Sequence, residues 1–172
     1  MTENRIGNRV LVIGSPGSGK STFAKKLRER TGLSLYYLDL LYHRPDRTTV
    51  SKEVFDKALA GVLEEEKWII DGNYPRTLPV RLSACDTVFF FDLPAEECIR
   101  GAEERIGKKR EDMPWVEESF DPEFRRYILD FPMEQTPKIR ALLDEYGEGK
   151  QIVRFQRREE ADAFLSGIEQ KS

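Results

Sequence analysis

The chain has 172 residues, 39% of them hydrophobic and 34% charged, with a formal net charge of -3. These values are typical of one globular domain and exclude a general electrostatic attraction to nucleic acids or anionic membranes. No apolar stretch is long enough for a bilayer, and the N-terminus lacks a signal-peptide core, so we expect a cytoplasmic protein without a membrane partner. Cys85 and Cys98 have no metal-binding spacing and are expected in the core.

The first chemical signal is the glycine-rich stretch GSPGSGKST at 14–22, directly after an apolar run at 10–13. It satisfies the phosphate-loop pattern G-x-x-x-x-G-K-S/T, between a predicted strand and a predicted helix. Glycines permit a tight turn whose N–H groups converge on an anion at the positive end of the helix. In such loops the lysine reaches the β- and γ-phosphates, and the following hydroxyl binds Mg²⁺. The predicted nucleotide-binding residues are Gly14, Ser15, Gly17, Ser18, Gly19, Lys20, Ser21 and Thr22.

The next predicted elements are an amphipathic helix over 20–30, which ends near Gly32, and a strand over 33–38. This strand delivers Asp39 to the carboxyl edge of a sheet, where open α/β proteins bind ligands. The segment 39–47 is predicted to be a connecting loop and carries His43, the only histidine, beside Arg44. We expect this loop to contact a substrate, while His43 by itself fits a solvated surface residue equally well.

Two further apolar runs, at 68–70 and 87–91, each end in an aspartate. Helical spacing of the apolar residues predicts a helix over 51–66 before the first run. Short, nearly all-apolar runs are typical of strands buried inside a parallel sheet. Asp71 and Asp92 therefore both fit the arrangement of a strand followed by a carboxylate that supports Mg²⁺ in nucleotide sites.

The C-terminal half continues the alternation of helices and strands. A helix from Pro94 to Ile106 leads into a polar segment at 107–119, which is predicted to be a mobile excursion. A helix from Pro122 is predicted to be interrupted by Pro132, and a second helical face follows at 139–146. The last strand is predicted over 151–155, before a closing helix through 161–168. This alternation predicts an α/β protein with a parallel sheet and helices on both faces.

The residues DGNYPRT at 71–77 resemble the Asp-Gly-Phe-Pro-Arg-Thr segment of adenylate kinases, with one residue inserted. With the glycine-rich loop, they make the chain similar to the nucleoside-monophosphate-kinase group of phosphate-loop kinases. The chain most resembles the short bacterial adenylate-kinase-like proteins known as DNA topology modulation proteins, and the resemblance covers nearly its whole length. It is carried by 38–39, 68–74, 76–77, 81–82, 86–88 and 131–132.

The resemblance implies a three-layer P-loop NTPase fold in a single kinase domain over 1–172, with a five-stranded parallel sheet in the order 2-3-1-4-5 and a short lid at about 107–120. The third strand would then lie beside the first. This arrangement favours Asp71 over Asp92 as the carboxylate that holds Mg²⁺ together with Ser21. Asp92 is instead expected to cap the helix that follows it.

The resemblance also implies roles for several arginines. Arg76 matches the arginine that binds the phosphate of the acceptor in adenylate kinases. Arg105 matches the arginine at which their lid segment begins and which packs near the adenine. Lys109 or Arg110 would be the lid cation. Arg126, or its neighbour Arg125, would supply a cation from the helix beyond the lid.

The chain departs from adenylate kinases on the acceptor side. Its lid has no four-cysteine zinc cluster, and 39–47 replaces the region that would read an acceptor base. An aspartate such as Asp39, followed by His43 and Arg44, is more like the phosphate-loop kinases of polyols and sugar acids, in which it binds the acceptor hydroxyl. Asp39 would then orient or deprotonate that hydroxyl.

We therefore predict a phosphotransferase that uses ATP and Mg²⁺ and acts on a small-molecule acceptor. The acceptor is left open among nucleotides, nucleosides, and hydroxyls of polyols or sugar acids. The alternatives are a nucleotide-binding regulator of DNA topology, and an ATPase or GTPase switch without an acceptor. A pI near 5.4 and scattered basic residues argue against DNA binding, and we expect a monomer or a weak homodimer.

Overall fold

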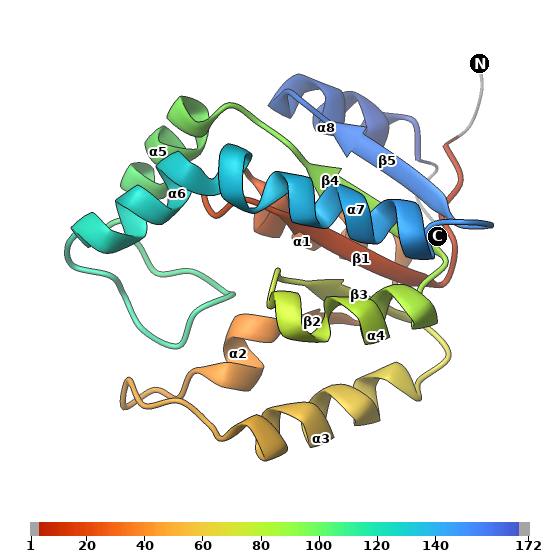
Figure 1. Cartoon of the computed structure of the whole chain (residues 1–172), viewed down its shortest axis with the longest axis horizontal. Helices are drawn as coiled ribbons and strands as arrows, with labels where there is room; N and C mark the ends of the chain where they lie inside the picture. The colour runs from red at the N-terminus through yellow and green to blue at the C-terminus, as the bar shows by residue number, and fades with distance from the viewer. Residues whose placement is uncertain (1–3, 169–172) are drawn as a thin grey trace.

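A computed structural model describes residues 4–168, and its centre is a five-stranded, all-parallel sheet (Figure 1). The strand order is β2-β3-β1-β4-β5, as predicted. Parallel neighbours require crossover connections, and the chain supplies a helical segment between each pair of successive strands. The strands are β1 (Arg9–Gly14), β2 (Leu35–Tyr37), β3 (Trp68–Asp71), β4 (Thr87–Phe91) and β5 (Gln151–Phe155).

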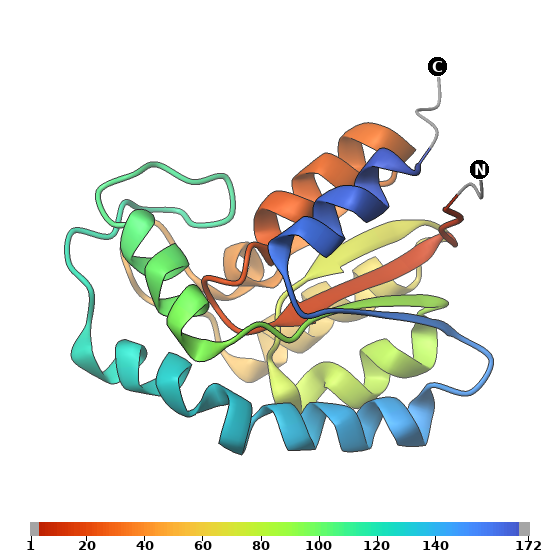
Figure 2. The same cartoon turned by 90° about the horizontal axis from the view of Figure 1, so that it is seen from above.

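Helices cover both faces of the sheet. α1 and α8 lie side by side on one face, while α4 and α7 cover the other (Figure 2). The helices are α1 (Lys20–Thr31), α2 (Leu38–Tyr42), α3 (Lys52–Leu63), α4 (Leu78–Ala84), α5 (Ala95–Glu104), α6 (Pro122–Glu134), α7 (Thr136–Tyr146) and α8 (Arg158–Ser166), with a short 3-10 helix, η1, at Pro75–Thr77. None of the helices within residues 4–168 has the length and apolar character needed to cross a membrane.

The sheet separates two apolar cores, because successive side chains of a strand point to opposite faces. In β1, Val10 and Val12 pack with α1, α5 and α8, whereas Leu11 and Ile13 pack with α3, α4 and α7. All four side chains are fully buried. Cys85 and Cys98 are also buried, one in each core, as predicted.

The sheet register brings three strand ends to one edge. Asp71 of β3 pairs with Val12 of β1 on one side and with Tyr37 of β2 on the other. On the opposite side of β1, Gly14 pairs with Phe91 of β4. The chain that follows β1 at 15–19 therefore starts next to Asp71, at the carboxyl edge where such sheets bind ligands.

Four local expectations are corrected by the structure. The strand predicted over 33–38 is shorter, and residues 38–42 form α2 where a loop was predicted. Helix α4 was not predicted, because it is only seven residues long and its buried stripe consists of few residues. Pro132 does not interrupt α6; it lies in the last turn, so the helix runs on to Glu134.

The fourth correction concerns Asp92, which does not cap α5. Pro94 directly precedes α5, and no side chain caps the start of this helix. Asp92 Oδ2 instead accepts a hydrogen bond from Arg154 Nε at 2.7 Å, with Arg154 Nη2 at 2.5 Å from the same oxygen. A cation from β5 therefore holds this carboxylate.

Candidate functional site

The site begins with the tight loop at 15–19 between β1 and α1. Gly14, Gly17 and Gly19 have φ values of 146°, 79° and 94°, which side-chain-bearing residues rarely adopt. The amide of Asn73 holds the start of this loop. Its Oδ1 accepts from Gly14 N at 2.9 Å, and its Nδ2 donates to Gly14 O at 2.5 Å. The loop is thus pinned to the segment after β3.

Arg81 positions that segment from α4. Its guanidinium is fully buried and donates to the backbone oxygens of Gly72, Asn73 and Tyr74, and to Thr77 Oγ1. Burial lowers the pKa of Arg81 to about 9. A buried arginine that spans four acceptors fixes the backbone from which Asn73 and Tyr74 reach the site.

Helices α5 and α8 close the back of the loop. A Cβ on Gly17 would lie 2.0 Å from Cys98 O, and one on Gly101 would lie 2.1 Å from Gly17 O. Arg158 Nη2, from α8, donates to Gly17 O at 2.8 Å. These contacts leave no room for a side chain and hold the loop against both helices, so its conformation is set before any ligand arrives.

Two carboxylates surround the hydroxyl of Ser21. Ser21 Oγ lies 2.6 Å from Asp71 Oδ2 and 3.3 Å from Asp112 Oδ2, and both aspartates are buried. Burial raises the pKa of Asp71 to about 6, opposed by Lys20 and by the Ser21 hydrogen bond. Asp71 Oδ1 is buried without a hydrogen-bond partner among the described residues. This pair of carboxylates attracts a cation.

Residues 4–168 contain no group of three or more His, Cys, Asp or Glu side chains arranged to hold a metal. Mg²⁺ does not require such a group, because it is commonly held by one or two carboxylates and takes its other oxygens from water and phosphates. Ser21, Asp71 and Asp112 fit this requirement.

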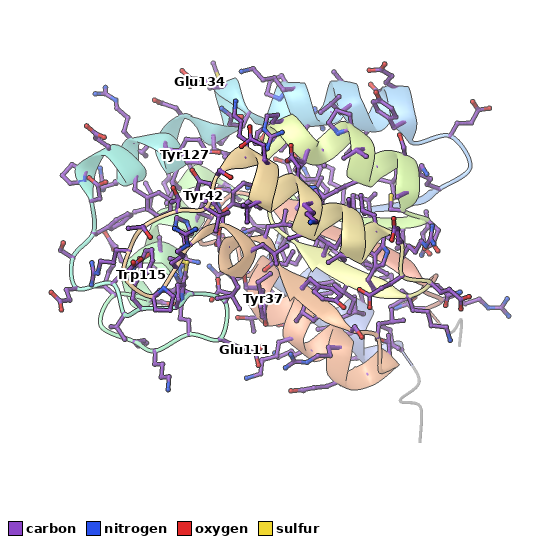
Figure 3. All side chains as sticks on the ribbon, turned by 90° about the horizontal axis from the view of Figure 1, so that it is seen from below. Tyr37, Tyr42, Glu111, Trp115, Tyr127 and Glu134 are labelled. Carbon is purple, nitrogen blue, oxygen red and sulfur yellow. The ribbon has the colours of Figure 1, made fainter. Side chains whose placement is uncertain are left out.

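The chain between α5 and α6, residues 105–121, forms a lid over the loop. Tyr37 Oη donates to Glu111 Oε2 at 2.5 Å, and Arg28 Nη2 donates to Glu111 Oε1 at 3.0 Å. Figure 3 shows Tyr37 and Glu111 on facing segments. Burial and Glu111 raise the pKa of Tyr37, while Arg28 and Tyr37 lower the pKa of Glu111. The predicted excursion is therefore docked on α1 and β2.

Two clefts meet beneath this lid. The first, here called the loop-side cleft, has a volume of about 380 Å³ and lies along the glycine-rich loop, the start of α1 and Arg158. The second, here called the aromatic cleft, has a volume of about 650 Å³ and extends from Asp39 and Tyr74 to Trp115 and the start of α6. Both open at the carboxyl edge of the sheet.

Three cations line both clefts: Lys20, Arg105 and Arg110. Arg105 Nε and Arg110 Nη1 are buried and have no hydrogen-bond partner within the described chain. Burial lowers the pKa of Arg105, and the charge of Arg110 lowers it further. Asp112 Oδ1, 3.7 Å from Arg110 Nε, and Glu117 Oε1, 3.4 Å from Arg110 Nη2, offset part of this charge. The remaining charge and the unused donors at the junction of the clefts suit a multiply charged anion.

Asp39 stands in the aromatic cleft, at the start of α2. Tyr74 Oη donates to Asp39 Oδ1 at 2.6 Å. Burial and Asp39 together raise the pKa of Tyr74, so this phenol remains protonated and continues to donate. The predicted substrate-side position of Asp39 is thus part of a cleft wall, together with His43 from the same segment.

Two of the predicted site residues that line neither cleft, Arg76 and Arg126, lie on the surface and pair with acids there. Arg76 Nη2 is 2.8 Å from Asp56 Oδ1, and Arg76 Nη1 is 3.0 Å from Asp56 Oδ2, in a bidentate pair on the surface. Arg126 is exposed on α6, with Nε 4.0 Å from Asp130 Oδ2. Each arginine therefore pairs with a nearby surface acid, because its place on its helix faces away from the loop.

Sequence reasoning missed several residues of the site. Asp112, Asn73, Tyr74 and Trp115 were not singled out for a role, and Arg110 was only one of two candidates for the lid cation. In the structure, Asp112 is buried and Arg110 is half-buried, next to the exposed residues 107–109 and Glu111 of the same polar run. The burial itself cannot be read from an irregular segment without periodicity.

The comparisons with known proteins do not identify a relative. The chain matches no protein-family model and no curated protein. The function must therefore be argued from the geometry of the loop, the lid and the two clefts.

Proposed function

We propose that this protein has a P-loop NTPase fold and is a Mg²⁺-dependent phosphotransferase, which moves the γ-phosphoryl group of ATP to a small-molecule acceptor. The observation that carries the proposal is the set of three cations shared by the two clefts, Lys20, Arg105 and Arg110. A transferred phosphoryl group passes between donor and acceptor, so the groups that neutralise it must face both.

The loop-side cleft suits the donor. Its N–H groups at the N-terminus of α1 and the ammonium of Lys20 would bind the phosphates of ATP. Ser21, Asp71 and Asp112 would hold Mg²⁺, which supplies charge neutralisation at the β- and γ-phosphates. The lid covers this cleft, and covering excludes water that would otherwise compete as the acceptor.

The aromatic cleft suits the acceptor. Asp39 would accept the proton of the acceptor hydroxyl as its oxygen forms a bond to the γ-phosphorus. The bond between the γ-phosphorus and the bridging oxygen breaks, and its electron pair leaves with ADP. Arg105 and Arg110 would stabilise the charge on the transferring group, with each such donor contributing about 2 to 4 kcal/mol.

The test is ADP formation from Mg·ATP with a panel of hydroxyl and phosphate acceptors. We expect Lys20→Ala to lower ADP formation by about 10²- to 10³-fold, because it removes a charge at the transferring group. Lys26→Ala is the matched control, since Lys26 is an exposed lysine on the same helix that lines neither cleft. Equal activity of the two variants would refute the proposal.

A further inference from the structure

The two ends of the aromatic cleft differ in charge. The three shared cations lie where it meets the loop-side cleft. Among the other described residues that line it, Arg47 is the one Lys or Arg, whereas Asp39 and Asp121 are acidic; Glu117 Oε1 lies at the junction, 3.4 Å from Arg110 Nη2. Arg47 is itself engaged, with its guanidinium carbon 5.5 Å from the centroid of the Trp115 ring. Away from the junction, Arg47 is therefore the one described cation that an anionic substituent could meet, and it already lies over the Trp115 ring.

Ring side chains dominate the same end. His43 and Trp115 meet edge to face with centroids 5.1 Å apart, and Phe120 contacts Phe124 with centroids 6.2 Å apart. Tyr127 lines the cleft from α6 (Figure 3). Such walls bind flat rings by stacking, which contributes about 1 to 3 kcal/mol per ring and needs no charge on the ligand.

Two polar groups remain to orient a ligand between these rings. His43 Nδ1 is buried without a hydrogen-bond partner in the described part of the chain. Asp39 uses Oδ1 to accept from Tyr74, which leaves its second carboxylate oxygen for a hydroxyl. A buried polar atom without a partner is costly unless a ligand or water satisfies it.

We propose that the acceptor is an uncharged hydroxyl compound that carries a planar aromatic ring, a description that nucleosides fit. The ring would lie between the aromatic walls with a polar edge at His43, and the hydroxyl would reach Asp39. This inference rests on the proposed function for the transfer step. A sugar acid would bring its carboxylate into the aromatic cleft, next to acidic side chains and rings that do not stabilise a negative charge. A monophosphate would compete with the γ-phosphoryl group for the shared cations.

Binding is measured with saturating Mg²⁺ and a non-hydrolysable ATP analogue present, by isothermal titration calorimetry with common ribonucleosides, their 5′-monophosphates, ribose and gluconate. We expect at least one ribonucleoside to bind about tenfold more tightly than ribose, gluconate and its own monophosphate. Tighter binding of gluconate or of a monophosphate would overturn the inference. So would the absence of ribonucleoside binding at millimolar concentration.

Trp115→Leu tests the ring wall directly. We expect it to weaken ribonucleoside binding about tenfold and to leave Mg·ATP binding unchanged, with Val116→Ala in the same lid as the control. Unchanged ribonucleoside affinity in Trp115→Leu would contradict the inference. Failure to bind Mg·ATP, with ribonucleoside binding intact, would instead refute the proposed function, so the two failures are distinguishable.

Discussion

The two clefts of this protein are built in different ways. In the loop-side cleft, one continuous stretch, the glycine-rich loop and the start of α1, faces residues 101–112 of α5 and the lid. The aromatic cleft is assembled from side chains of at least four segments, around 39–47, 72–75, 105–121 and the start of α6. Backbone chemistry suits a ligand common to many proteins, whereas assembled side chains can be specific for one molecule.

The lid joins the two clefts. Arg105 and Arg110 line both, while Glu111 and Asp112 belong to the loop-side cleft and Trp115 to the aromatic cleft. A single segment therefore contributes charge to both clefts and a ring to the aromatic cleft. Substitutions at single positions separate these contributions.

The largest effect is expected for Gly17→Ala, which tests whether the loop-side cleft depends on the backbone conformation of the glycine-rich loop. A Cβ there would lie 2.0 Å from Cys98 O, and the φ of 79° disfavours alanine. We expect a loss of about 2 to 4 kcal/mol in the free energy of unfolding, measured by urea denaturation, together with loss of Mg·ATP binding.

Gly149→Ala is the control for Gly17→Ala. Gly149 has the same φ of 79°, but nothing lies within 4 Å of the position that a Cβ would take there. This variant should lose only the left-handed backbone preference, about 1 kcal/mol. Similar losses in both variants would show that α5 does not constrain the loop.

The second effect concerns the carboxylate that the lid brings to Ser21. We expect Asp112→Asn to raise the Mg²⁺ concentration needed for ATP binding about tenfold, because it removes one of the two charges near the Ser21 hydroxyl. The measurement is a Mg²⁺ titration of ATP binding. Glu118→Gln, at an exposed acid of the same lid, should leave the titration unchanged; a similar shift there would indicate a nonspecific charge effect.

A smaller effect is expected from the contact that docks the lid. Tyr37→Phe removes the hydrogen bond to Glu111, which contributes about 1 kcal/mol, so amide hydrogen exchange in 107–120 should become a few times faster. Tyr36→Phe is a close control, because Tyr36 Oη donates to Glu65 on an exposed surface. Unchanged exchange in Tyr37→Phe would show that other contacts hold the lid.

The smallest effect is expected for Arg76→Ala. Its side chain is about half exposed and pairs with Asp56, and such surface pairs contribute about 0 to 1 kcal/mol. We expect ADP formation within about twofold of the unaltered protein, because Arg76 lines neither cleft. A large loss of activity would restore the role that the resemblance to adenylate kinases assigns to this arginine.

The sequence was sufficient for the frame of the fold. Apolar runs predicted the five strands, because buried parallel strands leave a continuous apolar signal. The resemblance implied the order of these strands in the sheet. Short elements were less visible. Helices α2 and α4 have five and seven residues, too few for a helical period to emerge. Pro132 was wrongly predicted to interrupt a helix: it removes one N–H donor, but α6 continues through it and ends two residues later, at Glu134.

In the candidate site, too, some residues could be predicted from local sequence and others could not. The glycine spacing, Lys20 and Ser21 could be predicted because the loop's shape depends on residues that are adjacent in the chain. The choice of Asp71 over Asp92 is supported by the sheet register and by the pairing of Asp92 with Arg154. Neither contact is encoded locally, so the apolar runs by themselves offered both aspartates, and only the resemblance favoured Asp71.

The sequence predicted a phosphate-loop pattern at the end of a buried strand. It also predicted a polar segment at 107–119, far from the loop in the chain. Only the tertiary structure brought that segment over the loop, placed Asp112 beside Ser21, and put Arg105 and Arg110 between two clefts. The physical reason is that these contacts join residues up to 91 positions apart. Their geometry follows from how the helices pack on the sheet, which no local pattern records.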